Sequence, residues 1–210
     1  MLTFLLIVAA GLLYLLVYEL LRNKLHLSNE YSRKTFHAVH GVLVGMAPFF
    51  ISYRWIIAFE LLLFIEMLLV RRYRLLRWLY QVGRVSWGDF FTVAGVVIVA
   101  LMHPNKWIFL AAMLHLGLAD AAAALVGKRY GKSTSYKVFG QTKSLAGSLA
   151  FYAVSIAIMI GIVHFGQLQP AFWPIILLLP PLVTLGENVS IFGSDNMVIP
   201  ILVVLLLAAS

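Results

Sequence analysis

Long uninterrupted runs of apolar residues recur along the whole chain, and they constrain its fold more than any other feature. A helix needs roughly 20 apolar residues to cross a hydrocarbon core of about 30 Å. Because the runs are continuous rather than alternating, they favour helices over strands. The sequence therefore predicts an all-α fold, a polytopic membrane helical bundle of about eight transmembrane helices. The expected spans are residues 2–21, 35–52, 55–70, 89–103, 107–126, 145–165, 171–186 and 197–209.

The composition agrees with a chain that lies mostly in lipid. Hydrophobic residues make up 62% of the 210 residues and charged residues 11%, whereas a soluble domain has about 25% charged residues. With about eight spans there is no room for a soluble domain, so residues 1–210 are predicted to form a single integral membrane domain. No basic residues precede the first apolar run, which favours a retained span over a cleaved signal peptide. The absence of cysteine excludes a disulfide framework and a thiolate metal site.

The basic residues give the expected bundle an orientation. All but two of the 16 lysines and arginines fall in alternate loops, and the exceptions are Arg54 and Lys106. The positive-inside rule places the basic loops in the cytoplasm and both termini on the opposite side of the membrane. We expect this membrane to be a plasma or inner membrane, or that of the endoplasmic reticulum. The net charge of +8 follows from this asymmetry, so anionic head groups or a nucleotide are better partners than nucleic acid.

Residues 71–86 combine arginines with a leucine face, a pattern typical of a short helix in the membrane interface.

The first polar island lies at the end of the fifth apolar run. Asp120 lies within that run, where a charge costs about 2.5–3.5 kcal/mol and needs a partner, a cavity or a metal. It is followed by the loop Gly127-Lys128-Arg129-Tyr130-Gly131-Lys132 and then by Lys143-Ser144, which is expected to open the next helix. Glycines let backbone amides approach an anion, and a helix N-terminus binds phosphate. The alternatives are a structural ion pair for Asp120 and an ordinary positive-inside loop.

Two further islands are expected on the same membrane face. Arg33, Lys34 and His37 are spaced to share one side of the second span; interfacial anchoring by the two cations is the alternative. Glu187-Asn188 and Asp195-Asn196 bracket a short polar segment, and their oxygens suit Mg²⁺. Helix capping by Asp195 is the alternative there. Glu60 and Glu66 receive no role, and His103, His115 and His164 show no ligand spacing.

Together the islands resemble a known family, the CTP-dependent lipid kinases that include dolichol kinase, phytol kinase and the yeast-type diacylglycerol kinase. The matching pieces occur in one order and cover most of the chain from residue 33 onward. They are Arg33-Lys34-x-x-His37, Leu118-Ala119-Asp120 through Lys132, Lys143-Ser144-Leu145-Ala146-Gly147-Ser148, and Glu187-Asn188 leading to Asp195-Asn196-x-x-x-Pro200.

The resemblance implies transfer of the γ-phosphoryl group of CTP to the hydroxyl of a membrane lipid alcohol, with Mg²⁺ or another divalent cation. Dolichol, polyprenol, phytol and diacylglycerol all remain open as the acceptor. Residues with an implied catalytic role are Asp120, Lys143 and His37. Those implied to bind nucleotide or phosphate are Arg33, Lys34, Lys128, Arg129, Lys132, Ser144, Asn188 and Asn196, and those implied to bind metal are Asp120, Glu187 and Asp195.

Two other functions fit part of the pattern. A CTP-using cytidylyltransferase that acts on phosphatidate has a similar acid, glycine-basic stretch and lysine. A lipid or solute transporter would also place Glu60 and Asp120 inside the membrane, but it leaves the clustering of the islands on one face unexplained.

Overall fold

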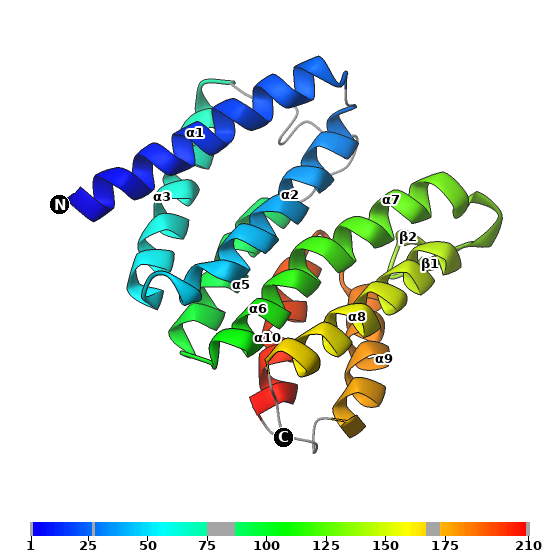
Figure 1. The fold of residues 1–210 in the computed structure, drawn as a ribbon. Coiled ribbons are helices and arrows are strands. Elements are labelled where there is room, and N and C mark those ends of the chain that lie inside the picture. The colour runs from blue at the N-terminus through cyan, green and yellow to red at the C-terminus, as the bar shows by residue number, and fades with distance from the viewer. Residues whose placement is uncertain (1, 27, 75–86, 167–172, 209–210) are drawn as a thin grey trace.

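The computed structural model describes residues 2–26, 28–74, 87–166 and 173–208, and it confirms the all-α prediction. Figure 1 shows α1, α2 and α3 on one side of the molecule and α7 and α8 on the other. The helices are α1 Leu2–Lys24, α2 Asn29–Met46, α3 Tyr53–Arg72, α5 Gly88–Leu101, α6 Lys106–Leu114, α7 Asp120–Tyr130, α8 Leu145–Phe165, α9 Trp173–Val189 and α10 Asp195–Ala208.

Helix length supports fewer membrane crossings than the sequence predicts. Among the described residues, two helices are long and apolar enough to cross a membrane: the continuous helix Lys106–Tyr130, of which 72% of the apolar window is buried, and α8, of which 33% is buried. Helices α5 and α10 have 14 residues each, which is about 21 Å of rise and less than the hydrocarbon core. Most of the interfacial helix expected near 71–86 lies outside the described residues, because α3 ends at Arg72 and the description stops at residue 74.

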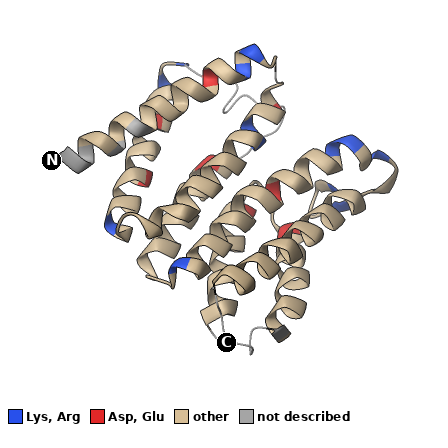
Figure 2. Cartoon of the chain, viewed as in Figure 1, with Lys and Arg blue, Asp and Glu red and all other residues tan. Residues whose placement is uncertain are grey.

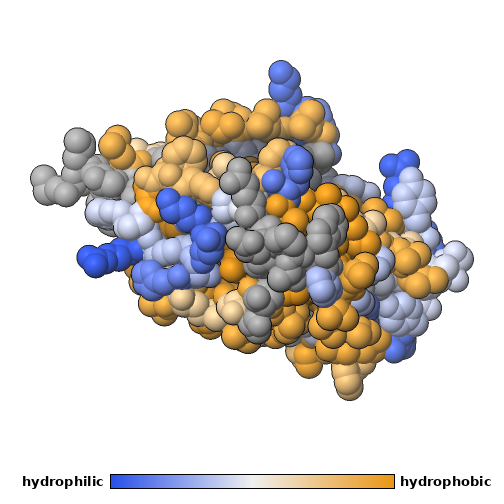
Figure 3. All heavy atoms as spheres, turned by 60° about the horizontal axis from the view of Figure 1, so that its bottom comes forward, coloured by the Kyte–Doolittle hydropathy of each residue, from blue (hydrophilic) through white to orange (hydrophobic). Residues whose placement is uncertain are grey.

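Large apolar side chains from α5, α6, α8 and α10 form the core. Val96, Phe109, Met113, Met159 and Val203 are all fully buried there. Many leucines on other faces of the helices are exposed instead. Figure 3 shows apolar residues across the middle of one face of the molecule, with hydrophilic residues toward its edges. An exposed apolar surface of this extent needs a partner or a lipid environment to cover it.

A break in regular helix geometry precedes Asp120. Residues His115–Ala119 form a π-helix, η2, between α6 and α7, and such segments are frequent at functional sites. Here α2 crosses η2 at two glycines: a Cβ on Gly41 would lie 2.8 Å from the Cα of Gly117. Because neither residue has a side chain, the two backbones approach closely. This contact brings the N-terminal half of α2 beside the start of α7.

A small hairpin, absent from the sequence prediction, connects α7 to α8. Strands β1 Ser135–Val138 and β2 Gln141–Ser144 pair antiparallel. The two residues between them, Phe139 and Gly140, both have positive φ angles, of 45° and 78°, as a tight two-residue hairpin turn requires. The hairpin lies beside the ends of α7 and α8 (Figure 1). It thus holds Lys143 and Ser144 in a fixed strand rather than in a free loop.

Candidate functional site

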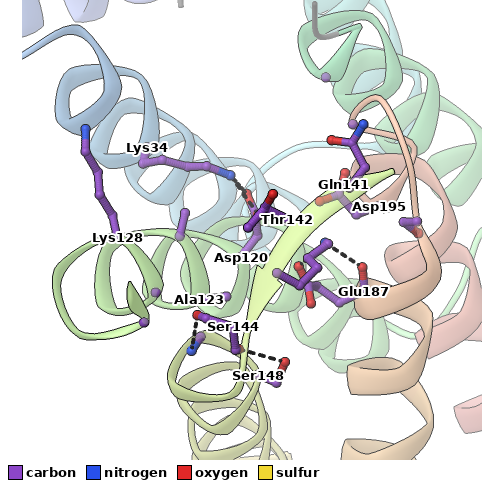
Figure 4. Close-up of a pocket in the computed structure, with 18 of the residues that line it drawn as sticks. Lys34, Asp120, Ala123, Lys128, Gln141, Thr142, Ser144, Ser148, Glu187 and Asp195 are labelled. Carbon is purple, nitrogen blue, oxygen red and sulfur yellow. Dashed lines mark hydrogen bonds and ion pairs between the residues drawn. The ribbon is translucent and has the colours of Figure 1, made fainter. Parts of the chain in front are cut away.

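One cavity of about 500 Å³ brings together residues from all three polar islands (Figure 4). It is bounded by α2, α7, the hairpin, the start of α8 and the connection from α9 to α10. Ten of the residues expected at the site line this cavity: Arg33, Lys34, Asp120, Lys128, Lys132, Lys143, Ser144, Glu187, Asp195 and Asn196. Figure 2 shows lysines and arginines mainly toward the ends of helices and acidic residues along them.

Lys34 and Asp120 form a buried ion pair in the wall of the cavity. The Lys34 Nζ donates to both carboxylate oxygens of Asp120, at 2.8 and 2.6 Å, and each side chain is only 5% exposed. The residues are 86 positions apart in the chain, and the close contact of α2 with η2 makes the approach feasible. The structural ion pair considered for Asp120 is therefore present, and the same carboxylate faces a cavity.

A second lysine–carboxylate pair joins the hairpin to α9. The Lys143 Nζ donates to Glu187 Oε1 at 2.5 Å and to the backbone carbonyl of Glu187 at 2.8 Å. The Glu187 side chain is 8% exposed and that of Lys143 is 17% exposed. The two buried pairs leave each lysine facing the cavity while an internal carboxylate compensates its charge.

Ser144 caps helix α8 at the edge of the cavity. Its Oγ accepts a hydrogen bond from the Gly147 backbone N–H at 3.1 Å. Helix α8 begins at Leu145, where the expected span 145–165 begins, and Lys143 and Ser144 belong to β2. There is no space for a side chain at Gly131, where a Cβ would overlap Ser144, and a Cβ at Gly127 would lie 2.9 Å from the same Oγ. These glycines allow the backbone to line the cavity closely.

Asp195 presents an unpaired oxygen at the opposite side of the cavity. Its Oδ1 is buried and has no hydrogen-bond partner among the described residues. Capping does not account for it, because the first N–H groups of α10 bond to backbone carbonyls, Asn196 to Gly193 and Met197 to Ser194. The neighbouring Asn196 donates its amide to the Gly88 carbonyl at 2.9 Å and so ties α10 to α5.

Three of the expected site residues do not line this cavity. The His37 Nε2 lies 3.6 Å from Asp89 Oδ1, on the side of α2 that faces α3 and α5. Arg129 is exposed and stacks near the ring of Tyr130. The Asn188 Oδ1 accepts hydrogen bonds from Tyr136 at 2.6 Å and from Ser148 at 2.9 Å. Asn188 therefore anchors the hairpin to α8 and α9.

The sequence did not single out several polar residues of the site. Gln141 and Thr142 line the cavity from β2, and Glu30 lines it from α2. Asp89 pairs with Arg71 at 2.9 Å. The sequence did carry a signal for Asp89. This acid lies in the first turn of an apolar helix, and a cluster of arginines precedes that helix. The hairpin residues carried no such signal, because polar residues between helices are usual in a loop.

Of the three histidines given no role, His115 has two hydrogen-bond partners, and His103 and His164 contact aromatic rings. The His115 ring bonds to the Ala111 carbonyl at 2.8 Å and to Ser155 Oγ at 2.7 Å, in the core.

Among the described residues, no group of three or more His, Asp or Glu side chains could hold a metal ion. Any cation bound here would need oxygens from a ligand as well as from the protein.

Comparisons with family models, with curated proteins and with solved structures give no match for this chain.

Proposed function

We propose that this protein is a polytopic membrane kinase that transfers the γ-phosphoryl group of CTP to the hydroxyl of a membrane lipid alcohol. The observation that carries the proposal is the meeting of three distant polar segments in one cavity beside apolar helices. Four lysines, Lys34, Lys128, Lys132 and Lys143, and the guanidinium of Arg33 line it. Four carboxylates, Glu30, Asp120, Glu187 and Asp195, line the same cavity, so this mixture of charges suits a polyphosphate that binds together with a divalent cation.

The residues of the cavity match what phosphoryl transfer requires. The reaction depends mainly on positioning and on neutralising the charge of the transferred group. Lys128, Lys132 and the capped start of α8 at Ser144 would hold phosphate oxygens. Lys34 and Lys143 are held by buried carboxylates and would turn to the phosphates when nucleotide enters. Asp120, once released by Lys34, would then accept the hydroxyl proton.

A divalent cation fits this site in part. The orphaned Asp195 Oδ1 lies in the cavity wall, and Glu187 is close to the same region. Mg²⁺ is usually held by one or two carboxylates together with substrate phosphates, so the absence of a three-residue cluster among the described side chains is compatible with it. Asp195 and Glu187 would hold the cation, and Asp120 would join them only after its ion pair opens. When bound, the cation neutralises phosphate charge.

The proposed setting is the cytoplasmic surface of a membrane. The exposed leucines of α1, α3 and α9 would face lipid, and the cavity lies on the side that carries most of the basic residues. A lipid alcohol can then bring its hydroxyl to the site without leaving the bilayer.

The position of a label in CTP tests this proposal against its nearest rival. Purified protein is incubated with lipid alcohol, with phosphatidate, or with both, and the lipid is extracted. A kinase moves label from γ-labelled CTP into the alcohol, whereas a cytidylyltransferase moves label from α-labelled CTP into phosphatidate. Ligand flux across vesicles without nucleotide consumption would instead support a transporter.

A further inference from the structure

A second, smaller cavity lies between α1, α2, α3 and α5. It neighbours the 500 Å³ cavity proposed to bind CTP, which is called the nucleotide cavity below. The smaller cavity has a volume of about 80 Å³, and since a water molecule needs about 10–15 Å³ of such space, several non-hydrogen atoms fit in it. Most of its wall is apolar. The apolar side chains that line it are Leu15, Phe36, Leu63, Met67, Val70 and Val93.

Polar atoms without partners interrupt this apolar wall. His37 Nδ1, both carboxylate oxygens of Glu60 and Glu66 Oε2 are buried and have no hydrogen-bond partner among the described residues. His37 is 5% exposed and Glu60 is fully buried. The His40 Nε2 lies 3.2 Å from Glu60 Oε1, close enough for an ion pair but without hydrogen-bond geometry. An unpaired buried polar atom is costly unless a ligand satisfies it.

The two cavities share a wall. On α2, Lys34 lines the nucleotide cavity and His37, less than one turn later, lines the smaller one. On α5, Gly88 lines the first and Asp89 the second. One helical turn rises about 5.4 Å. Neighbouring residues of α2 and α5 thus line the two cavities, which places the smaller cavity beside the proposed phosphate-binding residues.

We propose that the smaller cavity binds the hydroxyl-bearing end of an aliphatic alcohol. Its apolar wall suits a hydrocarbon chain, and the orphaned atoms of His37 and Glu66 accept a hydrogen bond from a hydroxyl. A carboxylate or phosphate headgroup would be repelled by Glu60 and Glu66. A long-chain amine is the rival ligand, because the unpaired carboxylate oxygens of Glu60 and Glu66 would attract its charge, and competition by an amine is therefore included in the test. The inference rests on the proposed function only in making this alcohol the phosphate acceptor.

Photolabelling tests the binding site without any turnover. The probe is a long-chain alcohol that carries a diazirine beside its hydroxyl, added to the protein in lipid nanodiscs without nucleotide. Mass spectrometry should find the label on α1, α2 and α3 around Leu15, His37 and Leu63. An unlabelled alcohol of the same chain length should compete with the probe, and the matching alkane and amine should not. Label spread evenly over lipid-facing residues, or equal competition by the alkane or the amine, would overturn the proposal.

A matched pair of variants gives a second, independent reading. Leu63→Trp fills the cavity, whereas Leu61→Trp places the same ring on the exposed face of the same helix. A loss of about 1.4 kcal/mol of affinity reduces occupancy at low probe about tenfold, and this reduction is expected for L63W alone. Equal labelling of the two variants contradicts the site. Should L63W unfold, Glu66→Met removes both acceptor oxygens at similar side-chain length and should weaken labelling in the same direction.

The outcome separates this inference from the proposed kinase activity. Specific labelling with no phosphate transfer would keep the alcohol site and reject the kinase. Phosphate transfer to an alcohol with no specific labelling, and with equal KM for the alcohol in L63W and L61W, would keep the kinase and reject this site.

Discussion

At the scale of single residues, the buried ion pair of Lys34 and Asp120 is expected to contribute both to the stability of the fold and to phosphoryl transfer. Removing one partner leaves the other as an uncompensated buried charge, which costs about 3–5 kcal/mol, whereas replacing both with apolar residues is often neutral. Asp120→Ala should therefore destabilise the protein strongly, and the double variant Lys34→Met with Asp120→Leu should recover most of the loss. Thermal unfolding of the purified variants in detergent measures both effects.

The kinase activity of the same variants tests the proposed chemical role of Asp120. All these variants should fail to phosphorylate lipid alcohol, including the double variant that folds. A folded double variant with wild-type turnover would show that Asp120 has only a structural role.

The orphaned oxygen of Asp195 leads to a separate prediction. Asp195→Asn removes a charge but breaks no hydrogen bond at Oδ1 in the described structure, so stability should change by no more than about 0.5 kcal/mol. Turnover should require at least about tenfold more Mg²⁺, because changes around a metal cost about 10–100-fold in affinity. A magnesium titration of turnover measures this, with Glu19→Gln on α1 as the control. An unchanged titration would remove Asp195 from the cation site.

The sequence identified the residues of the Lys34–Asp120 and Lys143–Glu187 ion pairs as candidates, but it did not predict which residue pairs with which. An acid in an apolar run already indicated a need for a partner, and Asp120 has one. That the partner is Lys34 depends on the crossing of two helices distant in sequence, which no local pattern encodes. His37 was expected beside Lys34 because they are less than one turn apart, yet that offset is enough to turn it toward Asp89 and another cavity.

At the scale of secondary-structure elements, the crossing of α2 and η2 sets the geometry of the site. A Cβ on Gly117 would lie 3.0 Å from the Gly41 Cα and from the His37 carbonyl. Gly117→Ala should therefore cost about 1–3 kcal/mol through overpacking. Gly161→Ala on α8 is the control, since open space surrounds it, and it should be neutral or stabilising by up to about 1 kcal/mol. Unfolding measurements that rank the two variants the other way would contradict the close packing.

The hairpin supports Lys143 through one tyrosine. The Tyr136 hydroxyl bonds to Asn188 and to Ser148, at 2.6 and 2.8 Å. Tyr136→Phe should cost about 1 kcal/mol and weaken CTP binding, because β1 would lose its hydrogen bond to α9 and the Lys143–Glu187 pair of β2 would be less firmly held. Hydrogen exchange of residues 135–144 should speed up in this variant and remain unchanged in Tyr152→Phe, the control on α8. Equal exchange in both variants would argue against this anchoring role.

The sequence predicted the helices but not the hairpin of β1 and β2. Apolar periodicity locates helices well, and the described helices overlap all eight expected spans. Strand β1, Ser-Tyr-Lys-Val, alternates polar and apolar residues over only four positions, and strand β2, Gln-Thr-Lys-Ser, has no apolar residue, so the pair gives too little alternation to identify a hairpin. Only the glycine after Phe139 hinted at the turn.

At the scale of the whole molecule, the proposed orientation can be tested with single cysteines, because the chain contains none. Ser133→Cys lies beside the basic hairpin and Ser52→Cys beside Arg54, at the other ends of the helices. A membrane-impermeant maleimide should label Ser133→Cys only from the cytoplasmic side and Ser52→Cys only from the opposite side. Labelling of both from one side would contradict the membrane arrangement.

The central claim is that CTP and a lipid alcohol react in the cavity shared by the three polar islands. Phosphorus NMR of the purified protein in nanodiscs with CTP, Mg²⁺ and a long-chain alcohol follows every product at once. We expect CDP and lipid monophosphate to appear in equal amounts with the wild type, and neither with Asp120→Asn. The formation of CMP and pyrophosphate, or unchanged CTP beside folded protein across a panel of lipid alcohols, would contradict the claim.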